Sequence, residues 1–310
     1  MAEFRFTLFT ATYNRKDTLP RLFESIKALS YDSFEWLIVD DGSTDGTDKL
    51  IAELKRKSHF SIRYIWQENA HKKTAWNKGV KMARGEFFVP IDSDDTLTSN
   101  ALHIFEAEWN SISKNERSDF IGVTCLCIDK EGRIVGDRFP SNRFVSDSLK
   151  LFFNDRIDGE KFGMSRVEVL REFPFPEELP DLVPEGVVWF RASVKYKTLF
   201  SNKVVRVYYD DVEGLTRVKR SSMYESRHKR RLGAVLSYKE ALELAEARQI
   251  SLFNYRLTFV MLQYWRWSFY CDTLELRKMR PIIHSMKYSI TLALIRPFGR
   301  VIFLTDKWIR

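Results

Sequence analysis

The stretch Phe87-Phe88-Val89-Pro90-Ile91-Asp92-Ser93-Asp94-Asp95 decides the fold, because an apolar run typical of a buried strand ends directly in three carboxylates. Carboxylates at positions i and i+2 beside a strand can share one hard divalent cation, which prefers oxygen ligands and often bridges a protein carboxylate to substrate phosphates. Surface turns are also rich in Asp, since its side chain hydrogen-bonds to nearby backbone. Taken alone, this stretch leaves both a metal-diphosphate site and an ordinary turn open.

A second acidic cluster follows an earlier apolar run, and a third strand-like run, at the opening of the chain, leads into a polar segment. The run Glu35-Trp36-Leu37-Ile38-Val39 leads into Asp40-Asp41-Gly42-Ser43-Thr44-Asp45, and the strand-like Phe6-Thr7-Leu8-Phe9-Thr10 leads into Ala11-Thr12-Tyr13-Asn14-Arg15. In open α/β sheets, ligands bind outside the carboxyl ends of the strands. We therefore expect the polar segments that follow these strands to face one crevice.

Strands and helices alternate through the first hundred residues. We expect strands near 6–10, 34–39, 62–67 and 86–91, with helices after Thr18, at about 47–57 and near 74–83. This order predicts an α/β fold with a doubly wound, mostly parallel, Rossmann-like sheet. Neither glycine-rich phosphate-binding pattern follows any of these strands, so a cation on Asp92 and Asp94 is the expected partner of a diphosphate.

Four motifs in the same order resemble the family 2 glycosyltransferases of GT-A fold. They are Thr10-Ala11-Thr12-Tyr13-Asn14-Arg15, Val39-Asp40-Asp41-Gly42-Ser43-Thr44-Asp45, Lys78-Gly79 to Ala83-Arg84-Gly85, and Asp92-Ser93-Asp94-Asp95. The resemblance covers about residues 4–130 well and continues loosely to 216, where Glu213-Gly214-Leu215-Thr216 resembles the end of the catalytic domain in bacterial capsule- and lipopolysaccharide-type members. It implies an inverting, metal-dependent enzyme that moves a sugar from a nucleoside diphosphate sugar to a hydroxyl of a growing glycan, such as a cell-surface polysaccharide or a lipid-linked precursor.

The resemblance also implies roles for particular residues. The family's Tyr-Asn segment and the second Asp of its Asp-Asp-Gly-Ser turn hold the base of the donor, with a UDP-sugar as the expected donor. Its Asp-x-Asp motif holds the ribose and a Mn²⁺ or Mg²⁺ ion on the diphosphate. Lys72 lies where the family often places a basic donor contact, although Lys72-Lys73 is also an ordinary surface pair. The implied donor-binding residues are Ala11, Tyr13, Asn14, Asp41, Lys72, Asp92 and Ser93, and the implied metal ligands are Asp92 and Asp94.

Transfer requires a base that deprotonates the acceptor hydroxyl as it attacks the anomeric carbon. The family usually takes this base from an acidic residue, often within Glu-Asp, that opens a helix with an Arg about six residues later. The matching stretch Pro184-Glu185-Gly186-Val187-Val188-Trp189-Phe190-Arg191 contains Glu185 as its single carboxylate, so the resemblance assigns the base to Glu185. Gly186 replaces the usual second acid, which leaves Asp181 as the alternative base and a helix-dipole role as the alternative for Glu185.

Charge divides the chain unevenly. Residues 217–310 hold 19 Lys and Arg against 7 Asp and Glu, whereas residues 1–216 hold 31 against 35. We predict a catalytic domain at 1–216, with its donor-binding half at 1–100 and its acceptor-binding half at 101–216. A basic, aromatic-rich helical extension follows at 217–310, and its tryptophans include Trp265, Trp267 and Trp308.

The extension is compatible with three kinds of partner. Basic and aromatic helices can lie in an anionic membrane interface, which we favour. They can also pack on the protein itself or on a second copy in a homodimer. Nucleic acid is a third partner, but the extension shows no recognised nucleic-acid motif, so we expect none. The two apolar stretches of the extension are not expected to span a bilayer, because basic residues such as Arg266, Arg296 and Arg300 interrupt them.

Cysteine usage indicates a reducing compartment. The chain has three cysteines, with Cys125 and Cys127 on one expected strand, which is too few for a disulfide framework. No apolar signal segment opens the chain, so we expect a cytoplasmic enzyme bound peripherally to the cytoplasmic face of the cell membrane. A nucleotidyltransferase and a non-catalytic nucleotide- or membrane-binding module on the same fold are the alternative functions.

Overall fold

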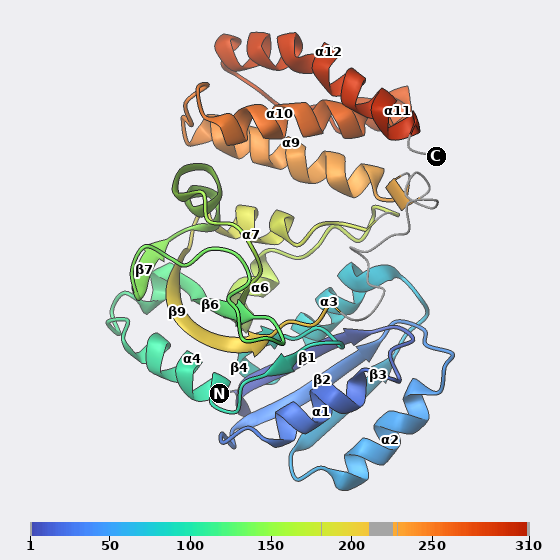
Figure 1. Ribbon diagram of the computed structural model, residues 1–310, viewed down its shortest axis with the longest axis vertical. Helices are drawn as coiled ribbons and strands as arrows, with labels where there is room; N and C mark the ends of the chain where they lie inside the picture. The colour runs from blue at the N-terminus through green and yellow to red at the C-terminus, as the bar shows by residue number, and fades with distance from the viewer. Residues whose placement is uncertain (1, 181, 211–225, 228, 309–310) are drawn as a thin grey trace. The chain divides into compact units, whose positions relative to one another are not determined.

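The computed structural model describes residues 2–180, 182–210, 226–227 and 229–308 (Figure 1). The chain forms two compact units, each assembled from three segments. The first unit comprises Met1–Asp147, Ile157–Pro174 and Lys195–Val212, and the second comprises Ser148–Arg156, Phe175–Val194 and Glu213–Arg310. The domain boundary expected after residue 216 lies outside the described residues, as does the segment 213–216 on which it rests.

The first half of the first unit is the predicted β-α series. Parallel pairing joins β3 (Ser61–Trp66), β2 (Phe34–Asp40), β1 (Phe4–Thr12) and β4 (Gly85–Pro90), in that order. The connecting helices are α1 (Leu19–Lys27), α2 (Thr47–Lys57) and α3 (His71–Met82), the last of which begins slightly before the expected residue 74. Because the strands run in a common direction, their carboxyl ends share one edge of the sheet. The expected α/β fold with a mostly parallel sheet is confirmed.

The second half of this unit extends the same sheet with mixed pairing, antiparallel except between β6 and β9, which run parallel. The order is β3-β2-β1-β4-β8-β6-β9-β5, with β7 paired to β9. The added strands are β5 (Thr96–Leu97), β6 (Phe120–Ile128), β7 (Arg143–Ser146), β8 (Lys161–Arg166) and β9 (Lys197–Val207); the helical elements are α4 (Ala101–Asn110), η1 (Arg117–Asp119) and α6 (Val167–Glu172). The segment 91–95 thus lies between two strands, β4 and β5, that both pair with the sheet.

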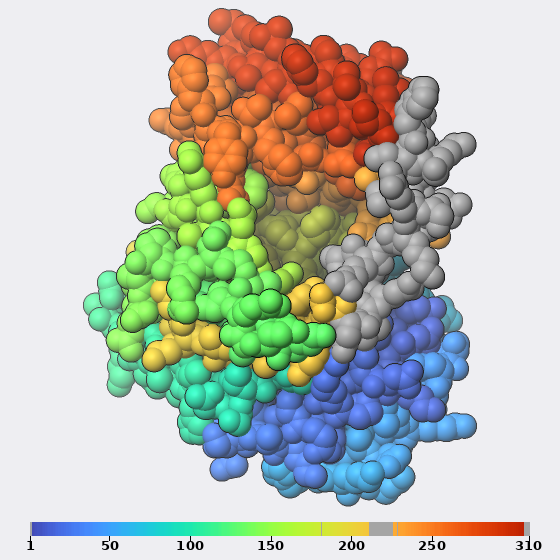
Figure 2. Space-filling view, viewed as in Figure 1, coloured from blue at the N-terminus to red at the C-terminus, as the bar shows by residue number. Residues whose placement is uncertain are grey.

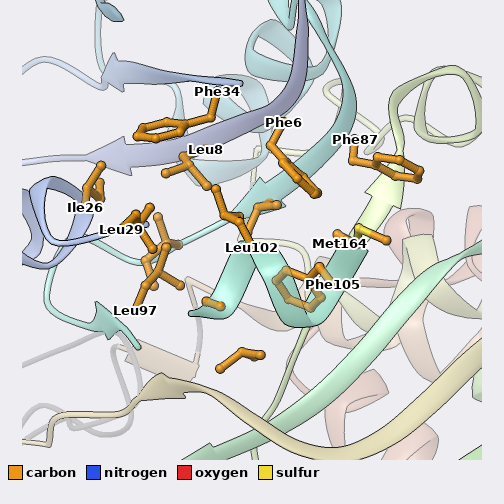
Figure 3. Packing of buried hydrophobic residues seen from close by; sticks show 14 of the residues in the cluster. Phe6, Leu8, Ile26, Leu29, Phe34, Phe87, Leu97, Leu102, Phe105 and Met164 are labelled. Carbon is orange, nitrogen blue, oxygen red and sulfur yellow. The ribbon is translucent and has the colours of Figure 1, made fainter. Parts of the chain in front are cut away.

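Large apolar side chains fill the space between the sheet and α4. Alternate residues of a strand point to the same face, so Phe6 and Leu8 of β1 share a face with Phe87 of β4. Leu102 and Phe105 of α4 pack into the same cluster, and all five side chains are fully buried (Figure 3). Burial of a side chain of this size stabilises the fold by about 1.5–3 kcal/mol. This cluster therefore fixes the strands whose ends carry the acidic segments.

A buried carboxylate, Glu35 of β2, ties several elements of this unit together. Glu35 is fully buried. Its oxygens accept hydrogen bonds from the Thr7 hydroxyl at 2.8 Å, the Arg84 backbone N–H at 2.9 Å and the Arg63 guanidinium at 2.9 Å. A buried carboxylate is stable only when its oxygens are paired in this way. The network joins β1, β2, β3 and the turn before β4.

The second unit is helical. Its elements are α5 (Ser148–Lys150), η2 (Leu151–Asp155), α7 (Gly186–Ala192), α9 (Arg231–Ala247), α10 (Tyr255–Ser268), α11 (Thr273–Lys278) and α12 (Met286–Trp308). Helix α10 packs against both α9 and α12 (Figure 1). The core between them includes Leu242 of α9, Leu257 and Tyr264 of α10, and Leu292 of α12.

Two tryptophans expected at a membrane interface are partly buried against the core of this unit. The Trp265 indole N–H donates to the Leu292 carbonyl at 2.7 Å, and the Trp267 ring centroid lies 5.6 Å from that of Tyr270. Composition alone does not tell which face of a helix such residues occupy, and here α10 turns them toward its neighbours. The side chain of Trp308 lies outside the described part of the chain.

Helix α12 is long and apolar enough, by length and composition alone, to cross a membrane. The qualifying window is Met286–Asp306, with a mean hydropathy of 1.2 and 17% of the window buried. The expectation that Arg296 and Arg300 exclude a span is therefore not met by these criteria. A helix of this composition can either span a bilayer or lie flat on its surface. The contacts of α12 within the unit, described below, bear on this choice.

Candidate functional site

Asn14 joins the loop after β1 to the loop after β2. Its backbone has a φ of 51°, in the left-handed region that Asn tolerates better than most residues. In this conformation its N–H donates to the Ser43 hydroxyl at 2.8 Å, and its side-chain carbonyl accepts from the Thr44 N–H at 2.9 Å. Sequence-distant segments that were both predicted to bind the donor are thus held side by side.

Tyr13 presents an aromatic face next to this junction. Its neighbour Thr12 accepts a hydrogen bond from the Asp41 N–H at 2.8 Å, and its other neighbour, Asn14, is tied to Ser43. Both flanking residues are therefore fixed, while the Tyr13 side chain remains 50% exposed. A half-exposed ring on a fixed backbone is suited to stacking against a flat ligand group.

The two adjacent carboxylates after β2 have different surroundings. Asp40 is fully buried, and its two oxygens accept from the Ser43 N–H at 2.8 Å and the Tyr64 hydroxyl at 2.6 Å. Burial and this hydrogen bond to Asp40 raise the pKa of Tyr64, so the phenol stays a donor. Asp40 therefore shapes the turn.

Asp41 is held by groups that sequence reasoning did not identify. One of its oxygens accepts from the Gln67 side-chain amide at 2.8 Å and from the Ala70 N–H at 2.9 Å. The Gln67 carbonyl oxygen is buried and has no hydrogen-bond partner among the described groups. Gln67 directly follows β3, so its place after a strand was the available signal. Asp41 and Gln67 together form a fixed polar pair beside Tyr13.

Lys72, in the first turn of α3, pairs with Asp92. The Lys72 ammonium lies 2.7 Å from a carboxylate oxygen of Asp92, and the two side chains are 33% and 44% exposed. Burial on its own would raise the pKa of Asp92, but the charges of Lys72 and Arg206 lower it to about 2. Asp92 is therefore ionised at any physiological pH. The contact also places Lys72 beside the Asp-x-Asp segment, and its role in donor binding stays a prediction.

The remaining residues of this segment divide between exposed and buried positions. Ser93 is 6% exposed, and Asp94 is half-buried, with its backbone carbonyl accepting from Arg21. Asp95 is 1% exposed and lies 2.8 Å from the Arg206 guanidinium of β9, and it also accepts from the Tyr209 N–H at 2.9 Å.

Asp95 has a structural environment that sets it apart from Asp92 and Asp94. Burial raises its pKa, while the Arg206 charge and the Tyr209 N–H favour its ionised form. Burial would lower the pKa of Arg206, but the facing carboxylates of Asp95 and Asp92 raise it above its usual value. Arg206 and Tyr209 lie more than one hundred residues after Asp95, so no local pattern pointed to them.

The chemistry of this donor set fits a divalent cation only in part. Asp92 and Asp94 offer carboxylate oxygens at i and i+2, and Lys72 already engages one oxygen of Asp92. Among the described residues, no three His, Cys, Asp or Glu side chains gather as a preformed metal site. A cation here would need further oxygens from a ligand or water, as is usual for Mg²⁺ on substrate phosphates.

The proposed base belongs to the other unit. Glu185 is the N-cap residue of α7, is half-buried, and makes no side-chain cap hydrogen bond. The Arg that follows in the motif, Arg191, makes a two-point pair with Glu240 of α9 at 2.9 and 2.6 Å. Asp181, the alternative base, lies outside the described residues. The structure thus brings together Ala11, Tyr13, Asn14, Asp41, Lys72, Asp92, Ser93 and Asp94 in the first unit, and Glu185 stands in the second.

Comparisons with known proteins agree with these motifs. Residues 7–173 match the family model described as Glycosyl transferase family 2. The chain is 28% identical over 209 residues to the GalNAc(5)-diNAcBac-PP-undecaprenol beta-1,3-glucosyltransferase of Campylobacter jejuni, which covers 66% of this chain and 64% of that protein. It is 35% identical over 95 residues to the poly-beta-1,6-N-acetyl-D-glucosamine synthase of Staphylococcus aureus, which covers 31% of this chain and 23% of that protein. The chain therefore spans less than two thirds of either relative.

Solved structures share the fold at low sequence identity. TarS from S. aureus, residues 1–349 in complex with UDP-GlcNAc, superposes with a TM-score of 0.59 at 17% identity, covering 97% of this chain and 89% of that one. The mannosyltransferase PcManGT from Pyrobaculum calidifontis, in complex with GDP-Man and Mn²⁺, gives 0.54 at 16% identity, covering 99% and 85%.

Proposed function

This chain belongs to glycosyl transferase family 2, and from that membership we propose that it is an inverting glycosyltransferase. It moves one sugar from a nucleoside diphosphate sugar to a hydroxyl of a growing glycan. One observation carries the proposal: at a single edge of the sheet, the half-exposed ring of Tyr13 and the acidic segments at Asp41 and Asp92 follow three adjacent parallel strands.

The donor is a UDP-sugar in this proposal. Its base stacks on Tyr13 and hydrogen-bonds to Asp41, whose orientation Gln67 and the Ala70 N–H fix. Ala11 and Asn14 line the same junction, and Ser93 and Asp92 lie toward the ribose and diphosphate. The UDP-GlcNAc complex of TarS, a protein of the same fold, supports a uridine donor.

A Mn²⁺ or Mg²⁺ ion is part of the proposed mechanism. Asp92 and Asp94 would hold it, and when bound it supplies positive charge that stabilises the departing diphosphate. Lys72 lies beside Asp92 at 2.7 Å, so its ammonium is placed to bind a phosphate oxygen as well. The Mn²⁺ complex of PcManGT supports a divalent cation in this fold.

Glu185 is the proposed base. Its carboxylate accepts the proton of the acceptor hydroxyl as that oxygen bonds to the anomeric carbon and the bond from that carbon to the diphosphate oxygen breaks. Attack from the face opposite the leaving diphosphate inverts the anomeric centre. The proposal is supported by the position of Glu185, which is half-buried and stands at the start of α7, as the family's acidic residue does.

The proposed acceptor is a cell-surface glycan or its lipid-linked precursor. The C. jejuni relative is named for an undecaprenol-linked acceptor. Such an acceptor lies at a membrane, and the basic C-terminal extension would keep the enzyme on the anionic cytoplasmic face of that membrane.

A panel of nucleotide sugars tests the proposal. With Mn²⁺ present, the correct donor should raise the thermal unfolding temperature, because a ligand that binds only the folded state adds stability by mass action. A chelator or the Asp94→Ala substitution should reduce that shift and abolish release of nucleoside diphosphate. If no nucleotide sugar shifts unfolding, or if Asp94→Ala retains full turnover, the proposed donor site is wrong.

A further inference from the structure

Helix α12 has two apolar faces, of which the second unit uses only one. On the inner face Tyr288, Leu292 and Phe303 are each 8% exposed. On the other face six apolar side chains are exposed along the length of the helix. Figure 2 shows the C-terminal segment, in red, at the surface. They are Met286 at 76%, Ile290 at 52%, Leu294 at 68%, Phe298 at 64%, Val301 at 59% and Leu304 at 44%. We call these six residues the outer stripe.

The outer stripe is one continuous face. Its members follow one another at intervals of four residues from 286 to 298 and of three residues from 298 to 304. At 3.6 residues per turn, these intervals place all six within an arc of about 120°. The inner-face residues lie on the opposite side of the helix. A stripe of this width on a surface helix normally covers a core, so an exposed one indicates a binding surface.

Contacts on the inner face fix α12 to α10. The Leu292 carbonyl accepts from the Trp265 indole, and Asp306 makes a two-point pair with the Arg266 guanidinium at 2.7 and 2.9 Å. At Gly299 the helices approach so closely that a Cβ would lie 2.6 Å from the Cβ of Trp265. The helix would lose these contacts if it left the unit to span a bilayer. A surface that lies on a membrane keeps them.

The charges around the outer stripe have one sign. Residues 273–308 contain seven Lys or Arg and two Asp or Glu. Both acids pair inside the unit, Glu275 with Arg231 at 2.7 Å and Asp306 with Arg266. The exposed basic side chains of this stretch are Arg277, Lys278, Arg280, Lys287, Arg296 and Arg300. An apolar face surrounded by exposed cations is complementary to anionic lipid headgroups above acyl chains.

We propose that the outer stripe of α12 docks flat on an anionic phospholipid bilayer, with its apolar side chains below the headgroups and the exposed Lys287 and Arg300 at headgroup level. This inference rests on one part of the proposed function, the lipid-linked acceptor. It assigns the attachment of the protein to the membrane to α12. The tryptophans of α10 are partly buried, and the Trp265 indole is engaged with the Leu292 carbonyl, so α12 offers the more exposed apolar face. Leu274 and Ile282, in the segment that precedes α12, are also exposed, at 65% and 66%.

The test uses the full chain and vesicles of defined composition. Vesicles of phosphatidylcholine alone are compared with vesicles that contain phosphatidylglycerol, at low and high salt, by co-sedimentation. Wild type should bind the anionic vesicles and be partly released by salt, which screens charge within about 8–10 Å. Leu294→Ser/Phe298→Ser should lower partitioning at least about tenfold, because two buried apolar side chains are lost. The matched control is Val194→Ser, which removes an apolar side chain that is 60% exposed outside the stripe and should leave binding unchanged.

A second variant separates charge from burial. Lys287→Gln/Arg300→Gln should lower binding to anionic vesicles about tenfold and reduce its salt dependence, while weak binding to neutral vesicles stays the same. Failure of wild type to bind anionic vesicles, or equal binding by the Leu294→Ser/Phe298→Ser protein, would overturn the proposal. A wild-type dimer that this variant converts to a monomer, without vesicle binding, would identify the stripe as an interface between copies instead. Thermal stabilisation by a soluble nucleotide sugar is measured in parallel, so a failure of donor binding is seen separately from a failure of membrane binding.

Discussion

Asp95 and Asp94 are neighbours in one acidic motif, and we predict that their removal has opposite consequences. Asp95 is 1% exposed and pairs at 2.8 Å with Arg206, which is itself 5% exposed. Replacing Asp95 with Ala leaves a buried guanidinium without its main countercharge and the Tyr209 N–H without its acceptor. Breaking a buried pair in this way costs about 3–5 kcal/mol. Asp94 is half-buried, so Asp94→Ala should change stability by less than about 0.5–1 kcal/mol.

Equilibrium urea denaturation measures both effects, and a double-mutant cycle attributes them to the pair. Asp95→Ala and Arg206→Met should each be strongly destabilising, whereas the double variant should recover part of the loss because neither charge is left buried alone. Stabilisation by the donor should show the opposite order. Asp94→Ala should lose most of the donor-induced stabilisation although its fold is intact. A loss below about 1 kcal/mol for Asp95→Ala, or strictly additive single effects, would refute the structural role of this pair.

Three further changes test other parts of the two units. Glu185→Gln should lower turnover by about 10²–10⁴-fold and leave donor-induced stabilisation unchanged; near-normal turnover, together with an inactive Asp181→Asn protein, would move the base to Asp181. Glu35→Ala removes the acceptor of Arg63 and of the Thr7 hydroxyl and should cost about 3–5 kcal/mol in urea denaturation, and a loss under about 1 kcal/mol would contradict the network. Lys72→Met should weaken donor binding while changing stability by less than about 1 kcal/mol, since both partners are partly exposed. Because the folded-state pKa of Asp92 is depressed to about 2 from 3.8, the stabilisation from this pair is complete above about pH 4 and is lost as the pH falls toward 2. In Lys72→Met that acid dependence should be reduced, and unfolding midpoints measured from pH 2 to 6 decide it.

Local patterns were sufficient for the donor-binding half of the fold. Apolar runs such as Phe87-Phe88-Val89, with Asp turn residues a few positions later, are typical of buried strands. The alternation of such runs with helices leaves few topologies. The residues expected at the strand ends are correspondingly close in the structure, as the Asn14–Ser43 and Lys72–Asp92 contacts demonstrate. Their catalytic roles remain predictions.

Partners supplied by distant segments were not predictable in the same way. Arg206 reaches Asp95 from β9, and Arg21 reaches the Asp94 carbonyl from α1. Neither residue belongs to a motif. The Arg206–Asp95 pair depends on how β9 is added to the sheet, which no local pattern shows. The helical unit shows the same limit, because composition identified an apolar extension but did not tell that Trp265 faces inward while Phe298 faces outward.

Gly186 stands where the family usually has the second acid of its pair. The structure gives no steric reason for a glycine at this position. A Cβ at Gly186 would meet no described heavy atom within 4 Å, and the residue is not among the glycines with positive φ. Neither close packing nor backbone conformation therefore requires glycine there. An acid at this first position of α7 would even be favoured by the helix dipole. Packing and backbone both allow a second carboxylate that the chain lacks, so we predict that a single carboxylate deprotonates the acceptor, with Glu185 as the proposed base and Asp181 as the alternative.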